Sequence, residues 1–258
     1  KMNADKIIVV IGFPKSGNTW VSRIIRQLYD GVIYNELHNK SESVDDSEPQ
    51  GANNVLIVKR HDADLRGVQD FLKRQNIISN DISYVYVKRN IRDVVLSGFS
   101  FNYPRLHKHR ASFLLKPFVA YETKTLAKSW VGPFWVRWYR KLFKIKNNFD
   151  QIPGNWENHV KNWISIDGVM HLSYESLIDD SLSNIKDISN KLGIQKNESF
   201  IEEVNELQSF KTKKNMFNKN NDKINSQFLR KGSYGYWADE LPASTALFIQ
   251  NKYGDYQK

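Results

Sequence analysis

The sequence contains no cysteine, which excludes disulfide bonds, thiolate metal ligands and a cysteine nucleophile. It also lacks any apolar run approaching the ~20 residues of a membrane-spanning helix, and no signal peptide is visible. These absences predict a protein of a reducing compartment without stable membrane insertion, and we expect a cytoplasmic location. Hydrophobic residues still make up 40% of the 258 positions, enough for one large α/β domain or two small ones.

Acidic residues are fewer than basic residues, 28 against 38, which gives a formal net charge of +10. A basic balance suits a polyanionic cofactor, an acidic acceptor, nucleic acid or a membrane surface. Charge alone does not choose among these partners, so the motifs have to decide.

The chain is organised around a stretch near its N-terminal end. Residues 7–11 are all β-branched, which predicts a strand buried on both faces. A short turn from Gly12 to Gly17 follows, with Lys15 inside it. Apolar residues then recur at helical spacing, namely Trp20, Val21, Ile24, Ile25 and Leu28. This strand–loop–helix unit points backbone N–H groups and the positive helix end at one place, which predicts a phosphate or sulfate site. The Lys15–Ser16 pair precedes Gly17, whereas in nucleotide triphosphate loops such a pair follows the second glycine.

Three further apolar runs predict parallel strands, at 55–58, 84–87 and 169–172. Four strands that each feed a helix predict a three-layer α/β fold, with a central parallel sheet flanked by helices. We expect one domain over residues 1–258. His61 follows the second run, at the carboxyl end of a strand, where open α/β sheets bind ligands.

Other segments are predicted from composition and spacing. Helices are expected over 65–72, 155–163, 176–192 and 242–251, and Gly193 is expected to end the third of them. The polar segment 31–54 is predicted to be a loop or lid, and the Asn- and Lys-rich segment 213–225 to be flexible.

Aromatic residues alternate with Arg and Lys over residues 101–149. This pattern can indicate binding of single-stranded nucleic acid, the lining of an acceptor pocket, or helix packing. The residues alone leave these three alternatives open.

Recognisable motifs lie at residues 14–20, 59–61, 89–97, 156–163 and 228–237. Together they resemble the motifs of the sulfotransferases that use 3′-phosphoadenosine 5′-phosphosulfate (PAPS). Residues 14–20 resemble the Pro-Lys-Ser-Gly-Thr-Thr-Trp loop of that family, and residues 59–61 resemble its Lys-x-His motif. Residues 89–97 resemble Arg-Asn-Pro-x-Asp-Val-x-x-Ser, with Ile91 in place of proline. Residues 156–163 resemble its Trp-x-x-His-Val-x-x-Trp helix, and residues 228–237 resemble Phe-x-Arg-Lys-Gly-x-x-Gly-Asp-Trp, with Tyr236 in place of aspartate.

The resemblance implies a role for each matching residue. His61 would be the general base, Lys15 would stabilise the leaving phosphate, and Lys59 would contact the sulfuryl group. The cofactor-binding residues that it implies are Lys15, Ser16, Gly17, Asn18, Thr19, Trp20, Arg89, Ser97, Tyr174, Phe210, Arg230, Lys231 and Gly232. Asn18 departs from the family's threonine, and Gln208 departs from its Thr-Ser-Phe-like segment. His159 is interpreted as structural.

The resemblance therefore implies a sulfotransferase (P-loop-like) fold and in-line transfer of a sulfuryl group from PAPS to a hydroxyl or amine of a small molecule, leaving PAP. No metal and no nucleic acid are expected, and the segment 101–149 is assigned to the acceptor pocket and to packing. One alternative is a carbohydrate or polysaccharide sulfotransferase, which the net charge favours. Another, of a different class, is a catalytically inactive module that binds nucleotides or nucleic acid.

Overall fold

The computed structural model describes residues 2–34, 54–98, 156–221, 229, 232–240, 247, 249–251 and 253. Within them lies one five-stranded sheet, in the order β3-β4-β2-β6-β7, and every neighbouring pair is parallel. The strands are β2 (Lys6–Ile11), β3 (Val32–Tyr34), β4 (Val55–Arg60), β6 (Ile82–Lys88) and β7 (Val169–Ser173). A separate two-stranded parallel sheet joins β1 (Met2–Asn3) to β5 (Ile77–Ile78).

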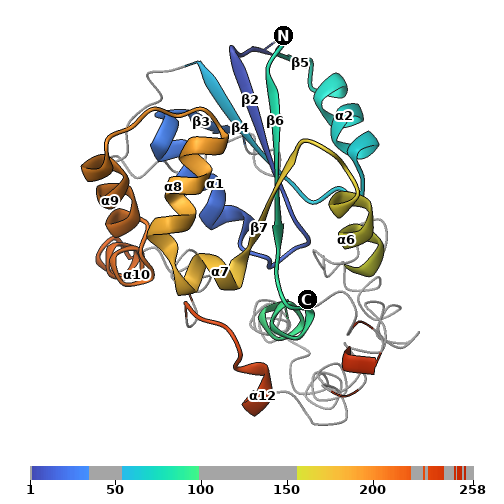
Figure 1. Ribbon diagram of the computed structural model, residues 1–258, viewed down its shortest axis with the longest axis vertical. Coiled ribbons are helices and arrows are strands. Elements are labelled where there is room, and N and C mark those ends of the chain that lie inside the picture. The colour runs from blue at the N-terminus through green and yellow to red at the C-terminus, as the bar shows by residue number, and fades with distance from the viewer. Residues whose placement is uncertain are drawn as a thin grey trace.

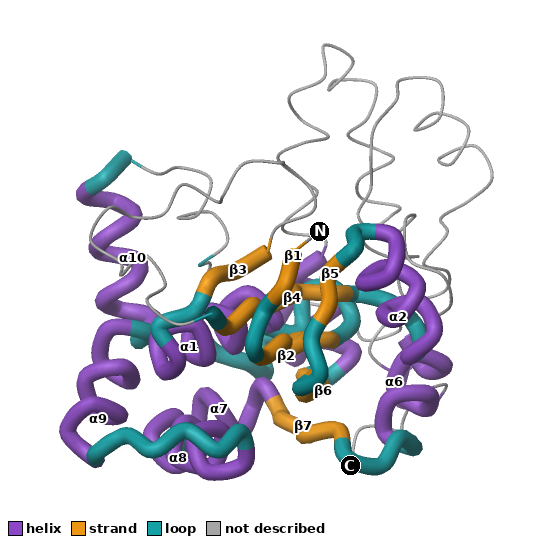
Figure 2. Tube along the Cα trace, turned by 90° about the horizontal axis from the view of Figure 1, so that it is seen from above, coloured by secondary structure: helices purple, strands orange, loops and turns teal. Residues whose placement is uncertain are grey.

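Helices cover both faces of the five-stranded sheet (Figure 1). On one face lie α1 (Asn18–Tyr29), α7 (Tyr174–Asp179), α8 (Ser181–Lys191), α9 (Glu198–Leu207) and α10 (Phe210–Lys219). On the other lie α2 (Leu65–Arg74) and α6 (Trp156–Ile164), and a short helix, α12 (Trp237–Glu240), lies below the sheet. Figure 2 shows the strands between α1, α9 and α10 on one side and α2 and α6 on the other. The predicted three-layer α/β fold is confirmed.

The run of β-branched residues in β2 is explained by its central place in the sheet. Ile8 and Val10 pack against α1, α8 and α9 in one core cluster, whereas the alternate residues Ile7, Val9 and Ile11 pack against α2 and α6 in another. All five side chains have no exposed surface. A strand with a helical layer on each face has no polar side, which removes the alternation of polar and apolar residues.

Two predictions of local structure were wrong. The helix predicted over 176–192 is two helices, because the Asp180 side chain accepts a hydrogen bond from Ser183 N and starts α8 as its N-cap. The flexible segment predicted over 213–225 contains most of α10, which buries Lys213 and Phe217 despite its polar composition.

Several predicted segments lie outside the described residues: 101–149, most of 31–54 and most of the last helix. None of the helices in the described part of the chain combines the length and apolar character that a membrane crossing requires.

Candidate active site

The loop between β2 and α1 has a backbone that few residues adopt. Gly17 is the N-cap of α1 with φ 101°, and Lys15 also has a positive φ, of 72°. A Cβ atom on Gly17 would lie 2.6 Å from the Tyr174 ring, so the loop passes directly against that side chain. The first turn of α1 carries no acidic residue. The positive end of α1 therefore stays uncompensated, as an anion site requires.

Arg89, directly after β6, anchors the loop between β2 and α1. Its Nη1 donates a hydrogen bond of 3.0 Å to the Lys15 carbonyl oxygen, and its guanidinium lies 4.0 Å from the centre of the Tyr174 ring. Three predicted cofactor residues from separate segments therefore meet at one place. Ser97, a fourth, lies farther along the helical segment 91–98 and is half-buried.

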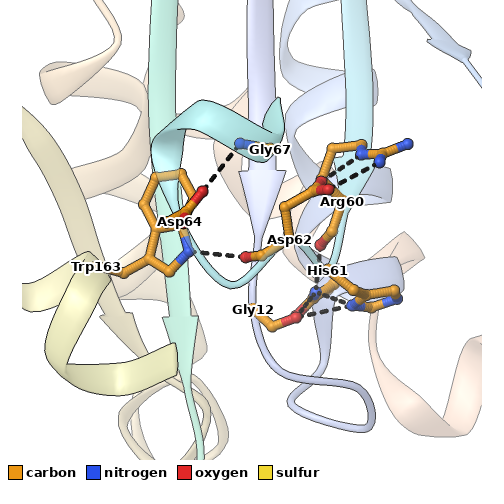
Figure 3. Close-up of polar contacts among 8 residues, drawn as sticks. Gly12, Arg60, His61, Asp62, Asp64, Gly67 and Trp163 are labelled. Atoms are coloured by element: carbon orange, nitrogen blue, oxygen red, sulfur yellow. Dashed lines mark hydrogen bonds and ion pairs between the residues drawn. The ribbon is translucent and has the colours of Figure 1, made fainter. Parts of the chain in front are cut away.

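The end of β4 brings two of the predicted catalytic residues to the same loop. Lys59 Nζ donates a hydrogen bond of 3.2 Å to Thr19 Oγ1 at the start of α1. His61 Nδ1 lies 2.7 Å from the Gly12 carbonyl oxygen (Figure 3). Arg60, between them, turns away to form an ion pair of 2.6 Å with Asp62 (Figure 3). Its guanidinium lies over the Phe71 ring. The alternation of the strand thus separates Arg60 from its two neighbours.

The environment of His61 suits a proton acceptor. A carbonyl oxygen can only accept, so the short contact with Gly12 assigns the ring proton to Nδ1 and leaves a lone pair on Nε2. The pKa of His61 is lowered to about 4, chiefly by burial of the ring and also by the positive charges of Lys59 and Arg60, although the hydrogen bond to Gly12 and the charge of Asp62 act in the opposite direction. The imidazole is therefore neutral near neutral pH, as a general base must be.

Asn18 was expected to help hold a phosphate, but its side chain faces the other way. The amide Nδ2 lies 2.9 Å from Gly12 O, 3.3 Å from Arg60 O and 3.1 Å from His61 Nδ1. The residue is only 3% exposed. Only the backbone N–H of Asn18 is left for an anion at the loop.

His159 lies behind His61 on α6, with no exposed surface. Its Nδ1 is 3.1 Å from the Tyr86 hydroxyl, and Phe13 meets its ring edge-on. Burial lowers its pKa to about 4, and the nearby His61 adds to this effect. These contacts fit the structural role predicted for His159.

The predicted adenine-binding residues gather at the other end of the loop. Trp20 Nε1 donates a hydrogen bond of 2.9 Å to the Gln208 carbonyl oxygen, and the Trp20 and Tyr174 rings meet edge to face. The Gln208 side chain in turn donates to Gln27 Oε1 over 2.7 Å. Sequence reasoning missed this anchoring role of Gln208, because the residue departs from the family's pattern and offers no motif.

Phe210 lies under the C-terminal loop. A Cβ atom on Gly232, whose φ is 66°, would come within 2.2 Å of the Phe210 ring. Arg230 and Lys231, which precede Gly232, lie outside the described residues. Gly235 N donates to both carboxylate oxygens of Asp93, and the Tyr234 hydroxyl donates to the Asp179 carboxylate over 2.8 Å. The sequence analysis also missed the anchoring roles of Asp93 and Asp179, because nothing in the sequence indicates that an acidic residue near a basic site holds a loop in place.

The residues present fit an anionic ligand. Ser16 Oγ and Arg89 Nε are buried and have no hydrogen-bond partner among the described residues. Both are donors, and both belong to segments that converge on the loop. Among the same residues, no group of three His, Asp or Glu side chains is placed to hold a metal ion.

Comparison with known proteins identifies the family. The sulfotransferase domain profile matches residues 5–257. An amine sulfotransferase of Oryctolagus cuniculus is 27% identical, over 92% of this chain and 76% of its own, and a 3-beta-hydroxysteroid sulfotransferase of Cavia porcellus is 25% identical, over 94% and 80%.

Solved structures show the same fold. A mouse sulfotransferase complexed with PAP superposes with a TM-score of 0.64 at 20% identity, covering 97% of this chain and 83% of that one. A retinol dehydratase in complex with androsterone and PAP gives a TM-score of 0.59 at 17% identity, covering 98% and 80%. The expected sulfotransferase fold and the resemblance are confirmed, and the alternative of an inactive binding module is not favoured. The chain belongs to the sulfotransferase domain family.

Proposed function

We propose that this sulfotransferase moves the sulfuryl group of PAPS to a hydroxyl or amine of a small-molecule acceptor, releasing PAP. The observation that carries the proposal is the convergence of Lys59 and His61 on the loop that holds Lys15, through Thr19 and Gly12. The names of the relatives, for an amine and for a hydroxysteroid, support a small acceptor. We further propose a single domain, which the span of the family match supports. We also propose a cytoplasmic location, with which the lack of cysteine agrees.

PAPS, when bound, supplies a sulfuryl group activated by its bond to phosphate. Ser16, Gly17, Thr19 and the backbone N–H of Asn18 hold the 5′-phosphate at the positive end of α1. Arg89, Ser97, Arg230, Lys231 and Gly232 hold the 3′-phosphate, and Trp20, Tyr174 and Phe210 line the adenine.

His61 accepts the proton of the acceptor at Nε2 as the nucleophile attacks sulfur. Lys15 and the loop N–H groups stabilise the charge that develops on the leaving phosphate, and Lys59 holds the sulfuryl oxygens. The low pKa of His61 keeps this base unprotonated across the neutral range, so kcat/KM should rise with pH only through about 4 and then level off.

The test is transfer of radiolabelled sulfate from PAPS to a panel of phenols, aliphatic alcohols, amines, simple sugars and acidic polysaccharides. Label on a small hydroxyl or amine compound is expected. His61→Ala should abolish transfer with little change in PAP affinity by calorimetry, whereas His171→Ala, on the exposed side of β7, should retain transfer. Label on polysaccharide alone, or full activity of His61→Ala, would contradict the proposal.

A further inference from the structure

We propose that Asn18 is a positioning residue, which fixes the orientation and the tautomer of the His61 ring. The inference rests on the proposed role of His61 as the base. At position 18 this chain has asparagine, whereas the sulfotransferase loop that it resembles has threonine.

The position of Asn18 lets one amide group join three segments. Asn18 is the first residue of α1, Gly12 follows β2, and Arg60 ends β4. The Nδ2 atom lies 2.9 Å from the Gly12 carbonyl oxygen and 3.3 Å from that of Arg60. A threonine hydroxyl has one proton and a shorter reach, so it cannot make both contacts.

The tautomer of His61 follows from its contact with Gly12. The Gly12 carbonyl oxygen can only accept, and it lies 2.7 Å from Nδ1, so Nδ1 carries a proton and Nε2 keeps the lone pair. The two protons of the Asn18 amide each have a carbonyl acceptor, so the amide does not donate to Nδ1, although the two nitrogens are only 3.1 Å apart. Asn18 therefore supports this tautomer by holding the Gly12 carbonyl oxygen beside Nδ1.

The amide itself is held in one orientation. Its Oδ1 is buried and has no hydrogen-bond partner in the described part of the chain, and a Cβ atom on Gly12 would lie only 2.4 Å from it. Turning the amide over would put Oδ1 against two carbonyl oxygens, which repel it. Asn18 therefore presents fixed donors to the backbone beside the base.

The charges that face His61 show why a neutral amide matters. Lys59 and Arg60 come from β4, Asp62 follows His61 in the chain, and His159 comes from α6. A carboxylate in place of the Asn18 amide would accept the Nδ1 proton and favour the charged ring. It would thus remove the base from its working form near neutral pH.

The test compares Asn18→Thr, Asn18→Ala and Asn18→Asp with wild type. Asn162→Ala is the matched control, because the Asn162 amide also donates to a backbone carbonyl, that of Ala63, over 3.1 Å. Nitrogen NMR of the histidine rings in the full chain reads the tautomer and pKa of His61 without requiring any turnover. Calorimetry with PAP, thermal unfolding, and the pH dependence of kcat and KM complete the set.

We expect wild type and Asn162→Ala to show the Nδ1-protonated ring. In Asn18→Ala and Asn18→Thr we expect mixed tautomers and a kcat lower by ~10- to 100-fold, with PAP affinity within about 3-fold. Asn18→Asp should raise the His61 pKa and move the acid limb of kcat upward. Asn18→Thr introduces the residue that the family has at this position, so it keeps the test decisive if the other variants fail to fold.

An unchanged tautomer and an unchanged kcat in Asn18→Thr and Asn18→Ala would overturn the inference. So would a loss of PAP affinity that matched the loss of kcat, because Asn18 would then be a cofactor-binding residue. If wild type transferred no sulfate to any acceptor, the proposed function would fail, and the NMR comparison would still decide whether Asn18 holds the ring.

Discussion

The guanidinium of Arg89 lies over the Tyr174 ring, 4.0 Å from its centre, while its Nη1 donates to the carbonyl oxygen of Lys15. The two residues come from the ends of neighbouring strands, β6 and β7, which pair directly. The contact with the ring and the hydrogen bond to Lys15 together restrain the guanidinium, so its remaining donors are held in place beside the loop. The ring also blocks any side chain at Gly17, so the same contact shapes the loop.

The first prediction concerns Arg89→Lys. Lysine keeps the charge but loses the planar set of donors, so it cannot hold the loop carbonyl and a phosphate together. Because a hydrogen bond to a charged group is worth about 1.5–3 kcal/mol, PAP affinity should fall by ~10- to 100-fold. Titration calorimetry measures this. Arg23→Lys is the control, since Arg23 also lies over a ring, that of Phe217, at 5.2 Å, but away from the loop. Equal losses in the two variants would refute the assignment.

A second prediction compares Gly17→Ala with Gly168→Ala. Both glycines have a positive φ, of 101° and 77°, so both variants carry backbone strain of about 1 kcal/mol. At Gly17 the new Cβ also meets a ring, at 2.6 Å, whereas at Gly168 no atom of the described residues lies within 4 Å of it. Overpacking should bring the loss in unfolding free energy for Gly17→Ala to about 3 kcal/mol. Urea unfolding measures both, and similar losses would show that Tyr174 moves aside freely.

The C-terminal loop gives a third comparison, Gly232→Ala against Gly235→Ala. The φ angles are 66° and 86°, but only a Cβ on Gly232 would meet Phe210, at 2.2 Å. We expect Gly232→Ala to push the loop off Phe210 and to weaken PAP binding by ~10-fold or more, whereas Gly235→Ala keeps its N–H bond to Asp93 and most of the affinity. If both variants bound PAP like wild type, the loop would have no part in holding the cofactor.

The fourth prediction concerns stability at acid pH. Burial lowers the pKa of His159 from 6.5 to about 4, so the unfolded chain binds more protons between these values. The free energy of unfolding should therefore fall as the pH drops from 6.5 toward 4. Wild type should lose about 3 kcal/mol more over this window than His159→Gln, which cannot titrate. Denaturant unfolding at several pH values tests this.

His171 provides the contrast for that measurement. Its ring is exposed on β7, and its pKa is lowered by burial to a lesser degree, with help from Lys191 and Lys88. His171→Gln should follow the wild-type pH dependence much more closely. A wild-type curve parallel to that of His159→Gln would mean that the buried ring becomes protonated without cost.

The sequence was most informative where spacing and burial coincide. The run 7–11 and the three other apolar runs predicted four strands of the sheet, because a strand covered on both faces must be apolar throughout. β3 was missed, since only three residues pair and its first, Val32, is 50% exposed. The break at Asp180 was missed because the apolar face continues across it, and only the cap reveals the end of one helix.

The site was predicted as separate motifs, and the contacts between them were not. That Lys59 meets Thr19 and that Arg89 meets Lys15 depends on the strand order, which local sequence does not contain. The orientation of Asn18 could not be predicted, because a polar residue in the loop is equally consistent with facing a phosphate or facing inward. Burial and the positions of the carbonyl oxygens decide that.

The central place of β2 has a consequence for folding. Ile7 pairs with Leu56 on one side and with Ile82 on the other. β2 therefore cannot pair until β4 and β6, which lie much farther along the chain, have been synthesised. Non-local parallel pairing of this kind is slow to nucleate. The anion-binding loop precedes β4 and β6 in the chain, so it can take its final shape only after both strands have left the ribosome, and its contact with Tyr174 needs β7 as well.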